Sequence, residues 1–574
     1  MDPGLDGHGL KIMQTTGKPR VKVKLSSLLW MLPAAFLFFF FLVPLGNILL
    51  VMATRSGVVS TNAILQPLWF TIWQAALSML LTLALGLPAA FVFARYNFAG
   101  KGALRLLTTL PFILPTVVVA AGFTALLGPR GLVNGWLMQA FNLQNPPIDF
   151  MNTLGAILIA HVFYNTSVVI RVVGSALVQF DPRIEEAGRV LGGSPWRVFR
   201  EVTLPLLRPS ILVAALMVFL FDFTSFGVIL LLGGPRFATL EVSIYTQTLS
   251  MLNLRMAGLL SFIQLACTIG ITLLYTRLNG KRSVPLMPRL RGETVRTPKS
   301  IFEKTTVGLM VAVLIVLLVS PLAALALKSV LQTDAATQTS NLTLAYYKEL
   351  FINRNDAFFY VPPAKAALNS LFYAAVTVLI SVGLGLTASY ALVRQRGLKR
   401  WLDPLIMLPL GTSAVTLGLG FLITFNKPPL DVSSFPLLIP LAHSLVALPF
   451  VVRTIQPALA SIPASLGESA ASLGASPWWV WREVELPIIR RAVMVGVIFS
   501  FTLSLGEFGA TSFLARPDTP TLPVAIYRFL SQPGAMNYGQ AMAMATLLML
   551  VCALAIGLLD KLQVEGRGSV NSDL

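Results

Sequence analysis

Apolar runs long enough to cross a lipid bilayer recur along this whole sequence. The stretch LLWMLPAAFLFFFFLVPLGNILLVM, from Leu28 to Met52, exceeds the roughly 20 residues that a helix needs to span the hydrocarbon core. Charged residues make up only 12% of the 574 residues, against roughly a quarter in soluble domains. Backbone groups in lipid must be hydrogen-bonded within the protein, and the alternating pattern of barrel strands is missing from the sequence. We therefore predict an all-α integral membrane protein.

The apolar runs and the breakers between them predict about twelve transmembrane helices. The first six are expected near 30–52, 68–94, 106–128, 152–178, 210–232 and 256–276, and the second six near 305–328, 366–393, 404–425, 435–459, 490–514 and 539–560. The first run is longer than the apolar core of a signal peptide, about 7–15 residues, and no small-residue cleavage site follows it. We expect a retained helix there, with a cleaved leader as the alternative.

The distribution of basic residues predicts the topology. With the N-terminus inside, about 32 of the 43 Lys and Arg residues fall in cytoplasmic segments, as the positive-inside rule requires. We therefore predict a multi-pass protein of a bacterial or archaeal cell (inner) membrane, with both termini in the cytoplasm. Topology also accounts for the net charge of +19, so the expected surroundings are the lipid bilayer and no nucleic-acid partner is predicted. Cys267 and Cys552 lie in apolar runs, which indicates neither a disulfide nor a metal site.

The chain contains an internal duplication. LALGLPAAFVFAR, ending at Arg95, resembles GLGLTASYALVR, ending at Arg394, and His161 corresponds to His443. The offset between the copies is near 298 before the histidines and near 282 after them. The predicted domains are an N-terminal tail (1–29), a first half (30–280), a basic linker (281–304), a second half (305–560) and a C-terminal tail (561–574). Both halves have the same orientation, so we expect parallel repeats with a translocation path between them.

A polar segment stands out between the fourth and fifth spans of each half, at about 183–208 and 463–491. The copies read EEAGRVLGGSPWRVFREVTLPLLRP and GESAASLGASPWWVWREVELPIIRR. Each copy predicts a short helix that ends at a glycine, followed by a second helix that begins with an N-cap serine and an N1 proline. A Leu-Pro pair is expected to end the second helix, because proline disfavours a helical residue before it.

The spacing in these segments resembles the EAA signature of permease subunits in binding-protein-dependent ABC importers. The residues that carry the resemblance are Glu186, Ala187, Gly188, Gly192, Leu204 and Pro205 in the first copy, and Glu468, Ser469, Ala470, Gly474, Leu486 and Pro487 in the second. Gly188 and Ser469 stand where the family favours alanine. The resemblance implies the type I importer permease fold, two parallel six-helix repeats, with these residues coupling the chain to ATPase subunits. A chain with both halves fused is similar to thiamine- and ferric-iron-type permeases, and the sequence does not choose between those cargoes.

The resemblance also implies partners. Two copies of a cytoplasmic ABC ATPase would dock on the two segments, and a solute-binding protein outside the cell would deliver a small hydrophilic solute. The chain has no G-x-x-x-x-G-K-[ST] phosphate loop, so ATP and Mg are expected on the partner, and no catalytic, metal or cofactor residue is predicted here. The alternative is a major facilitator transporter. That class usually has a G-x-x-x-D-R-x-G-R-R-like loop where this chain has RYNFAGKGALR.

Four ionisable residues inside predicted spans are candidates for the translocation path, because such residues are costly in a membrane. They are His161, Asp222, His443 and Glu507. The two acids are not equivalent by repeat, since Ser225 aligns with Glu507 and Ser504 with Asp222. A structural role remains open: the histidines would hydrogen-bond between helices, and Glu507 would cap a helix break.

Overall fold

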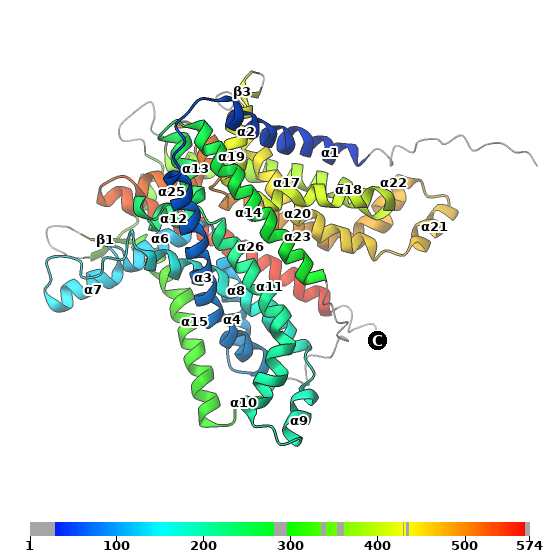
Figure 1. Cartoon of the computed structure of the whole chain (residues 1–574), viewed down its shortest axis with the longest axis horizontal. Coiled ribbons are helices and arrows are strands. Elements are labelled where there is room, and N and C mark those ends of the chain that lie inside the picture. Colours follow the sequence, from blue (N-terminus) through cyan, green and yellow to red (C-terminus); the bar gives the residue numbers. More distant parts are fainter. Residues whose placement is uncertain are drawn as a thin grey trace, which may run out of the picture.

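The computed structural model describes residues 29–280, 295–333, 340–352, 361–428, 430–431 and 435–568. Helices dominate these residues (Figure 1). The predicted N-terminal tail lies outside them except for its last residue, as do 281–294 of the predicted linker and 569–574 of the predicted C-terminal tail.

The first half contains six helical stretches long and apolar enough to cross a membrane. They are α1–η2–α2 (Met31–Leu37, Phe38–Leu42, Val43–Thr54), α3 (Asn62–Arg95), α6–α7 (Thr116–Leu127, Leu132–Phe141), α8 (Leu154–Gln179), α10–η3–α11 (Pro195–Val198, Phe199–Thr203, Leu204–Phe223) and α14 (Leu254–Gly280). Shorter helices between them are α4 (Lys101–Leu107), α5 (Leu110–Ile113), α9 (Pro182–Val190), α12 (Gly227–Leu232), η4 (Pro235–Phe237) and α13 (Leu240–Leu249).

The second half repeats this order. Its long helices are α15 (Ile301–Lys328), α17 (Pro363–Arg394), α20 (Leu438–Ala460), α22–η6–α23 (Pro477–Val480, Trp481–Glu485, Leu486–Gly506) and α26 (Ala535–Gly568). The sixth is a pair, α18–η5 (Arg396–Met407, Leu408–Gly411) and α19 (Ala414–Thr424), bent by 98°. Shorter elements are α16 (Ala345–Glu349), α21 (Ala464–Ser472), α24 (Thr511–Leu514), α25 (Leu522–Leu530) and the hairpins β1–β2 (Leu331–Thr333, Ser340–Leu342) and β3–β4 (Asn426–Lys427, Leu430–Asp431). The described residues thus hold eleven spans, or twelve with the bent pair.

Three sets of predicted boundaries were wrong. The third span was predicted at 106–128, but the structure breaks that stretch at Leu114–Pro115 and starts the span at Thr116. The fifth and eleventh spans, predicted at 210–232 and 490–514, begin earlier and end at Phe223 and Gly506. Apolar residues after these ends belong to α12 and α24, short helices that follow a break. Composition alone does not separate them from the span, because both are equally apolar.

Each half is built on a three-helix bundle. In the first half α3, α8 and α11 pack on one another, and in the second α17, α20 and α23 do the same. Their contact faces are apolar, with clusters such as Val169, Val173 and Leu177 in one half and Val451, Ile455 and Leu459 in the other. The packing of these three helices is therefore the same in both halves, as expected from the repeated sequence.

The first span of each half packs on the opposite half. Helices α1 and α2 contact α17 and α19, and α15 contacts α6 and α3. Both crossings are close because a glycine faces a proline: a Cβ at Gly122 would lie 2.9 Å from the Pro321 carbonyl oxygen, and one at Gly420 would lie 3.0 Å from Pro44 Cβ. The two glycine–proline pairs are equivalent by repeat. The two halves therefore exchange their first spans symmetrically, each first span packing on the other half in the same way.

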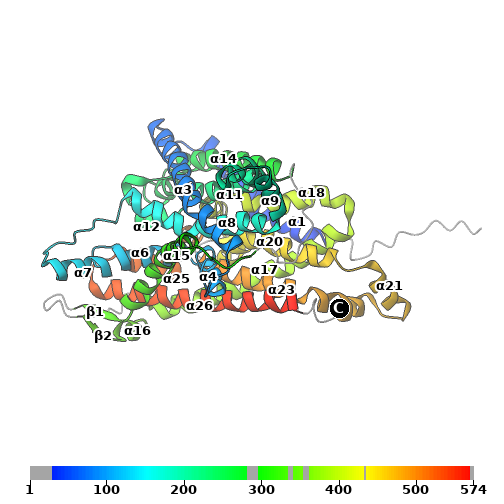
Figure 2. The ribbon, with the colours of Figure 1, turned by 90° about the horizontal axis from the view of Figure 1, so that it is seen from below.

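The repeated polar segments lie on one side of the molecule. In Figure 1 helices α9 and α10 lie at the bottom and α21 and α22 at the right, whereas α7 and β1 lie at the left and β3 at the top; Figure 2 also places α7 and β1 at the left and α21 at the right. The fold therefore separates the two repeated segments from the loops at the other end of the spans.

Candidate coupling and translocation sites

The first polar segment folds as the sequence predicts up to its second helix. Helix α9 ends in a turn where Gly192 has a φ of +85° and the Gly193 N–H donates to the Gly188 carbonyl oxygen over 3.1 Å. A left-handed φ of this kind favours glycine, which has no Cβ to clash with the backbone. Ser194 then caps α10, its hydroxyl accepting from the Arg197 N–H over 3.3 Å.

The second segment has the same geometry. Gly474 has a φ of +88°, and the Ala475 N–H donates to the Ala470 carbonyl oxygen over 3.1 Å. The Ser476 hydroxyl caps α22 by accepting from the Trp479 N–H over 3.4 Å. The predicted glycine turn and Ser-Pro helix start are thus confirmed in both copies.

The predicted end of the second helix was wrong. Leu204-Pro205 and Leu486-Pro487 do not end it, because α10 continues through η3 into α11 and α22 continues through η6 into α23. Both η3 and η6 are π-helical turns of five residues placed directly before the Leu-Pro pair. Proline lacks an N–H and its ring crowds the preceding turn, and a wider turn accommodates it without breaking the helix.

The tips of both segments expose apolar side chains. Leu191 is 88% exposed and Leu473, its repeat equivalent, is 90% exposed. Trp196 stacks on Phe199 and Trp478 on Trp481, with ring centroids 5.6 and 4.8 Å apart, so both outer rings are held in place while remaining largely exposed. The other predicted coupling residues are mostly at the surface as well: Glu186, Ala187, Gly192, Leu204, Pro205, Glu468, Ser469, Gly474 and Pro487 are exposed, whereas Gly188, Ala470 and Leu486 are half-buried. Matched exposed apolar tips on polar segments are typical of docking surfaces.

An ion pair joins the first segment to the foot of the second span. Arg95, the last residue of α3, contacts Glu185 of α9 at 2.5 Å, and the Thr203 hydroxyl donates to the same carboxylate over 2.9 Å. Sequence analysis did not predict this pair. The repeat of an arginine at the end of the second span, Arg95 and Arg394, was the available signal.

The second half has an ion pair at the same place with a different acid. Arg394, the last residue of α17, pairs with Glu485 of η6, and the Tyr390 hydroxyl donates to Glu485 over 2.6 Å. Glu485 is equivalent by repeat to Thr203, and Glu185 is equivalent to Gly467. The two halves therefore supply the carboxylate from two different elements.

A buried polar cluster lies inside the first three-helix bundle. His161 of α8 contacts Ser78 of α3 through Nδ1 at 3.0 Å and Ser225 through Nε2 at 2.8 Å. Asp222, near the end of α11, lies 3.4 Å from His161 Nδ1 and accepts from the Asn165 amide over 2.7 Å. All three helices of the bundle are joined by this cluster.

The second bundle has the corresponding cluster. His443 of α20 contacts Ser504 of α23 through Nδ1 at 2.8 Å, and its Nε2 lies 3.1 Å from the Glu507 carboxylate. Ser504 donates to Thr377 of α17, which is equivalent by repeat to Ser78. Glu507 also accepts from the Ala510 and Thr511 N–H groups, so it caps α24 at the break.

The four candidate path residues are therefore brought together as two pairs, one in each half. Their exposed fractions are 2% for His161, 1% for Asp222, 1% for His443 and 8% for Glu507. Both pairs hydrogen-bond to neighbouring helices of their own half in this conformation.

The helix breaks beside these clusters meet at the interface between the halves. Phe226, at the break after α11, stacks on Phe508, at the break after α23, with ring centroids 5.5 Å apart. Tyr245 lies against Phe226 at 5.4 Å and Tyr527 against Phe508 at 5.5 Å. Sequence analysis did not predict this contact of four rings between the halves.

A buried carboxylate also crosses the interface. Glu241 of α13 is 1% exposed and accepts hydrogen bonds from Ser413, the N-cap of α19, and from Gln264 of α14. Burial raises the pKa of Glu241 from 4.5 to about 8, against the opposing effect of these two hydrogen bonds. Pro523 stands at the equivalent position of the second half. That difference between TLEVSIY and TLPVAIY is the sequence signal for this residue.

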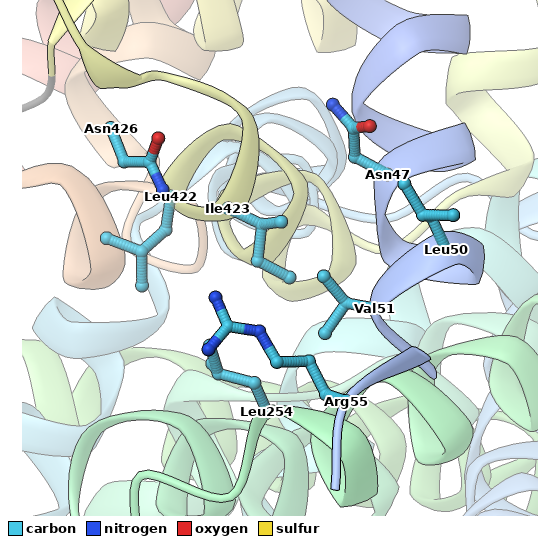
Figure 3. A pocket seen from close by; sticks show the side chains of 8 residues that line it. All are labelled: Asn47, Leu50, Val51, Arg55, Leu254, Leu422, Ile423 and Asn426. Atoms are coloured by element: carbon cyan, nitrogen blue, oxygen red, sulfur yellow. The ribbon is translucent and has the colours of Figure 1, made fainter. Parts of the chain in front are cut away.

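A pocket of about 260 Å³ lies where α2 meets α14 and α19 (Figure 3). Arg55, Asn47 and Asn426 supply its polar lining, with leucine, isoleucine and valine side chains around them. It lies at the contact between the exchanged first span and the second half and includes none of the four candidate path residues.

Two parallel six-span repeats, each with a helix–glycine-turn–helix segment on the same side, define the permease of an ABC importer. Comparison with known proteins supports this class directly. The family model described as "Binding-protein-dependent transport system inner membrane component" matches residues 83–282 and again 355–566. The chain belongs to this family, as a fusion of two permease halves.

Curated relatives share this fused arrangement over most of their length. A probable ABC transporter permease protein of Sinorhizobium fredii is 26% identical over 82% of this chain and 83% of its own. The thiamine transport system permease protein of Escherichia coli is 27% identical over 86% of this chain and 88% of its own. A putative ferric transport system permease protein of Haemophilus influenzae is 25% identical over 81% and 72%. The alternative of a major facilitator transporter finds no support in these matches.

Proposed function

We propose that this permease imports a small organic cation of the thiamine type, driven by two ATPase subunits that dock on α9–α10 and α21–α22. The observation that carries the docking proposal is the matched pair of exposed tips. Leu191 and Leu473 would each enter an apolar groove on one ATPase copy, beside Glu186 and Glu468, which would make polar contacts at its rim. ATP and Mg would be held by those subunits.

The topology follows from this docking. The side that carries the two segments would be cytoplasmic, together with both chain termini, and the side that carries α7 and β1 would face a solute-binding protein outside the cell. The concentration of Lys and Arg in the segments on the first side supports this orientation.

The solute would pass between the halves, at the centre of the interface. Phe226, Phe508, Tyr245 and Tyr527 meet there, and the faces of such rings attract organic cations. The relatives named as thiamine permeases cover this chain more completely than the one named as a ferric permease. His161, Asp222, His443 and Glu507 would border this path as the halves separate.

Co-purification tests the docking. The tagged chain would be extracted from its host in mild detergent, and bound proteins identified by mass spectrometry. We expect a soluble ATPase with a phosphate loop, present at two copies per permease. Recovery of the chain without an ATPase, under conditions that preserve other importer complexes, contradicts the proposal.

Mutation and uptake measurements test the mechanism and the solute. Glu186→Ala with Glu468→Ala should abolish uptake while membrane insertion stays normal. In a host strain that lacks its own thiamine uptake systems, cells that express this chain with its ATPase and solute-binding protein should accumulate radiolabelled thiamine. Accumulation of labelled ferric iron instead of thiamine would show that the solute is ferric iron and would reject the thiamine proposal.

A further inference from the structure

Arg95 and Arg394 occupy equivalent positions at the ends of α3 and α17, where each holds a carboxylate. In the Arg95 pair the two side chains are 11% and 16% exposed, whereas in the other pair Glu485 is 8% exposed and Arg394 is 59% exposed. Each carboxylate is largely shielded from water and accepts a second hydrogen bond, from Thr203 in the first half and Tyr390 in the second, so its geometry is more fixed than in an ion pair between two exposed side chains. The exposed pair of Arg197 and Glu201, within a single helix, provides the contrast.

The acid comes from a different element in each half. In the first half Glu185 belongs to α9, so the pair ties the docking helix itself to α3. In the second half Glu485 belongs to η6, so the pair ties the foot of α23 to α17. The equivalent of Glu185 is Gly467, which has no side chain to reach Arg394.

We propose that Arg95–Glu185 and Arg394–Glu485 are positioning pairs that carry the movement of a docked ATPase into the three-helix bundles, with the acid interchangeable between the α9 and η3 positions. This rests on the proposed docking function. Without such a pair, α9 or η3 would move with the ATPase while α3 stayed behind. ATP would then be hydrolysed without displacing the bundle.

Interchangeable positions allow a rescue experiment. Glu185→Gly removes the first pair, and Thr203→Glu in the same chain places an acid at the position that Glu485 has in the second half. The reciprocal variants are Glu485→Thr and Glu485→Thr with Gly467→Glu. A side chain fits at Gly467, because a Cβ there would meet only Val480, at an ordinary 3.6 Å.

Each variant would be purified with its ATPase and reconstituted in proteoliposomes with the solute-binding protein. Three quantities are measured: the amount of ATPase bound, the rate of ATP hydrolysis, and the solute imported per ATP. We expect Glu185→Gly to keep its ATPase and its hydrolysis but to import at least fivefold less solute per ATP. Adding Thr203→Glu should return that ratio to within twofold of the wild type. Glu185→Gly with Arg200→Glu, which puts an acid on the exposed side of the same helix, should not.

The outcomes separate this inference from the docking proposal. Absence of ATPase from the wild-type preparation rejects docking itself. Normal import per ATP by Glu185→Gly overturns the inference, and so does equal rescue by Arg200→Glu. A loss of ATPase binding and hydrolysis together with import, not reversed by Thr203→Glu, would mean that Glu185 only stabilises the fold.

Discussion

The rings of Phe226 and Phe508 stack with centroids 5.5 Å apart and planes inclined by 23°. The two residues are equivalent by repeat, so the same position of each half forms this contact. An isologous contact of this kind lies on the two-fold axis that relates the halves. The proposed path between the halves would therefore open at this stack.

Removing both rings should make the closed permease leak. Phe226 and Phe508 are 6% and 3% exposed, and truncating a buried phenylalanine to alanine leaves a cavity that costs about 3–5 kcal/mol. In proteoliposomes without ATP, Phe226→Ala with Phe508→Ala should release trapped labelled thiamine several times faster than the wild type. Phe39→Ala is the control, because Phe39 is 59% exposed and is not one of the four rings of this contact. Equal retention by a folded double variant would place the closing contact elsewhere.

The exchanged first span should be sensitive to a single methyl group. Alanine at Gly122 would place Cβ 2.9 Å from the Pro321 carbonyl oxygen, and overpacking of this kind costs about 1–3 kcal/mol. Alanine at Gly308 of α15, where nothing lies within 4 Å, should leave stability unchanged or raise it, because glycine weakens a helix. Thermal unfolding in detergent distinguishes the two, and a Gly122→Ala melting temperature at or above that of Gly308→Ala would disprove the close crossing.

Glu241 should make stability depend on pH. Its pKa in the folded protein is raised to about 8 from 4.5, so the folded state binds the proton more tightly than the unfolded chain does. This contribution is fully present below pH 4.5 and is lost as the pH rises to about 8. Glu241→Gln stays neutral, so its melting temperature relative to the wild type should rise between pH 5 and pH 8.5 and then level off. A constant difference across that range would contradict the assigned pKa.

The sequence predicted the parts of this fold that depend on local patterns. Long apolar runs located most spans, and Gly192 and Ser194 located the turn and helix start of the first segment, because a left-handed φ and an N-cap each favour few residue types. The repeat then extended these predictions to the second half.

Other features depend on contacts that no local pattern encodes. The helix continues through Pro205 by way of a π-turn. At the bend before Ala414, Ser413 donates to Glu241 of the first half. Arg95 and Arg394 are equivalent by repeat, but the acids that pair with them, Glu185 and Glu485, are not. Alignment of the two repeats therefore does not reveal that the acids have the same role. The stack of Phe226 on Phe508 joins residues from different halves, and the stretches FDFTSFG and SLGEFGA carry no local signal for that contact.

Moving the carboxylate between repeat-equivalent positions also tests whether Asp222 and Glu507 line the translocation path or only hold the buried histidines. In the first half the carboxylate of Asp222 lies near His161 Nδ1 and Ser225 contacts Nε2. In the second half Ser504 contacts His443 Nδ1 and Glu507 lies near Nε2. Each imidazole thus has one carboxylate and at least one hydroxyl as neighbours. The carboxylate lies near Nδ1 in the first half and near Nε2 in the second.

If the acids serve to hold the histidines, the first half should tolerate the arrangement of the second. Asp222→Ser alone removes the carboxylate beside His161 and the acceptor of the Asn165 amide, and an unpaired buried polar group costs about 1–3 kcal/mol. Adding Ser225→Glu restores a carboxylate to the imidazole, so the double variant should recover most of the wild-type uptake and melting temperature. A double variant that recovers its melting temperature but not its uptake, with an altered KM for the solute, would show that the carboxylate must stand at Asp222. The cluster would then belong to the translocation path.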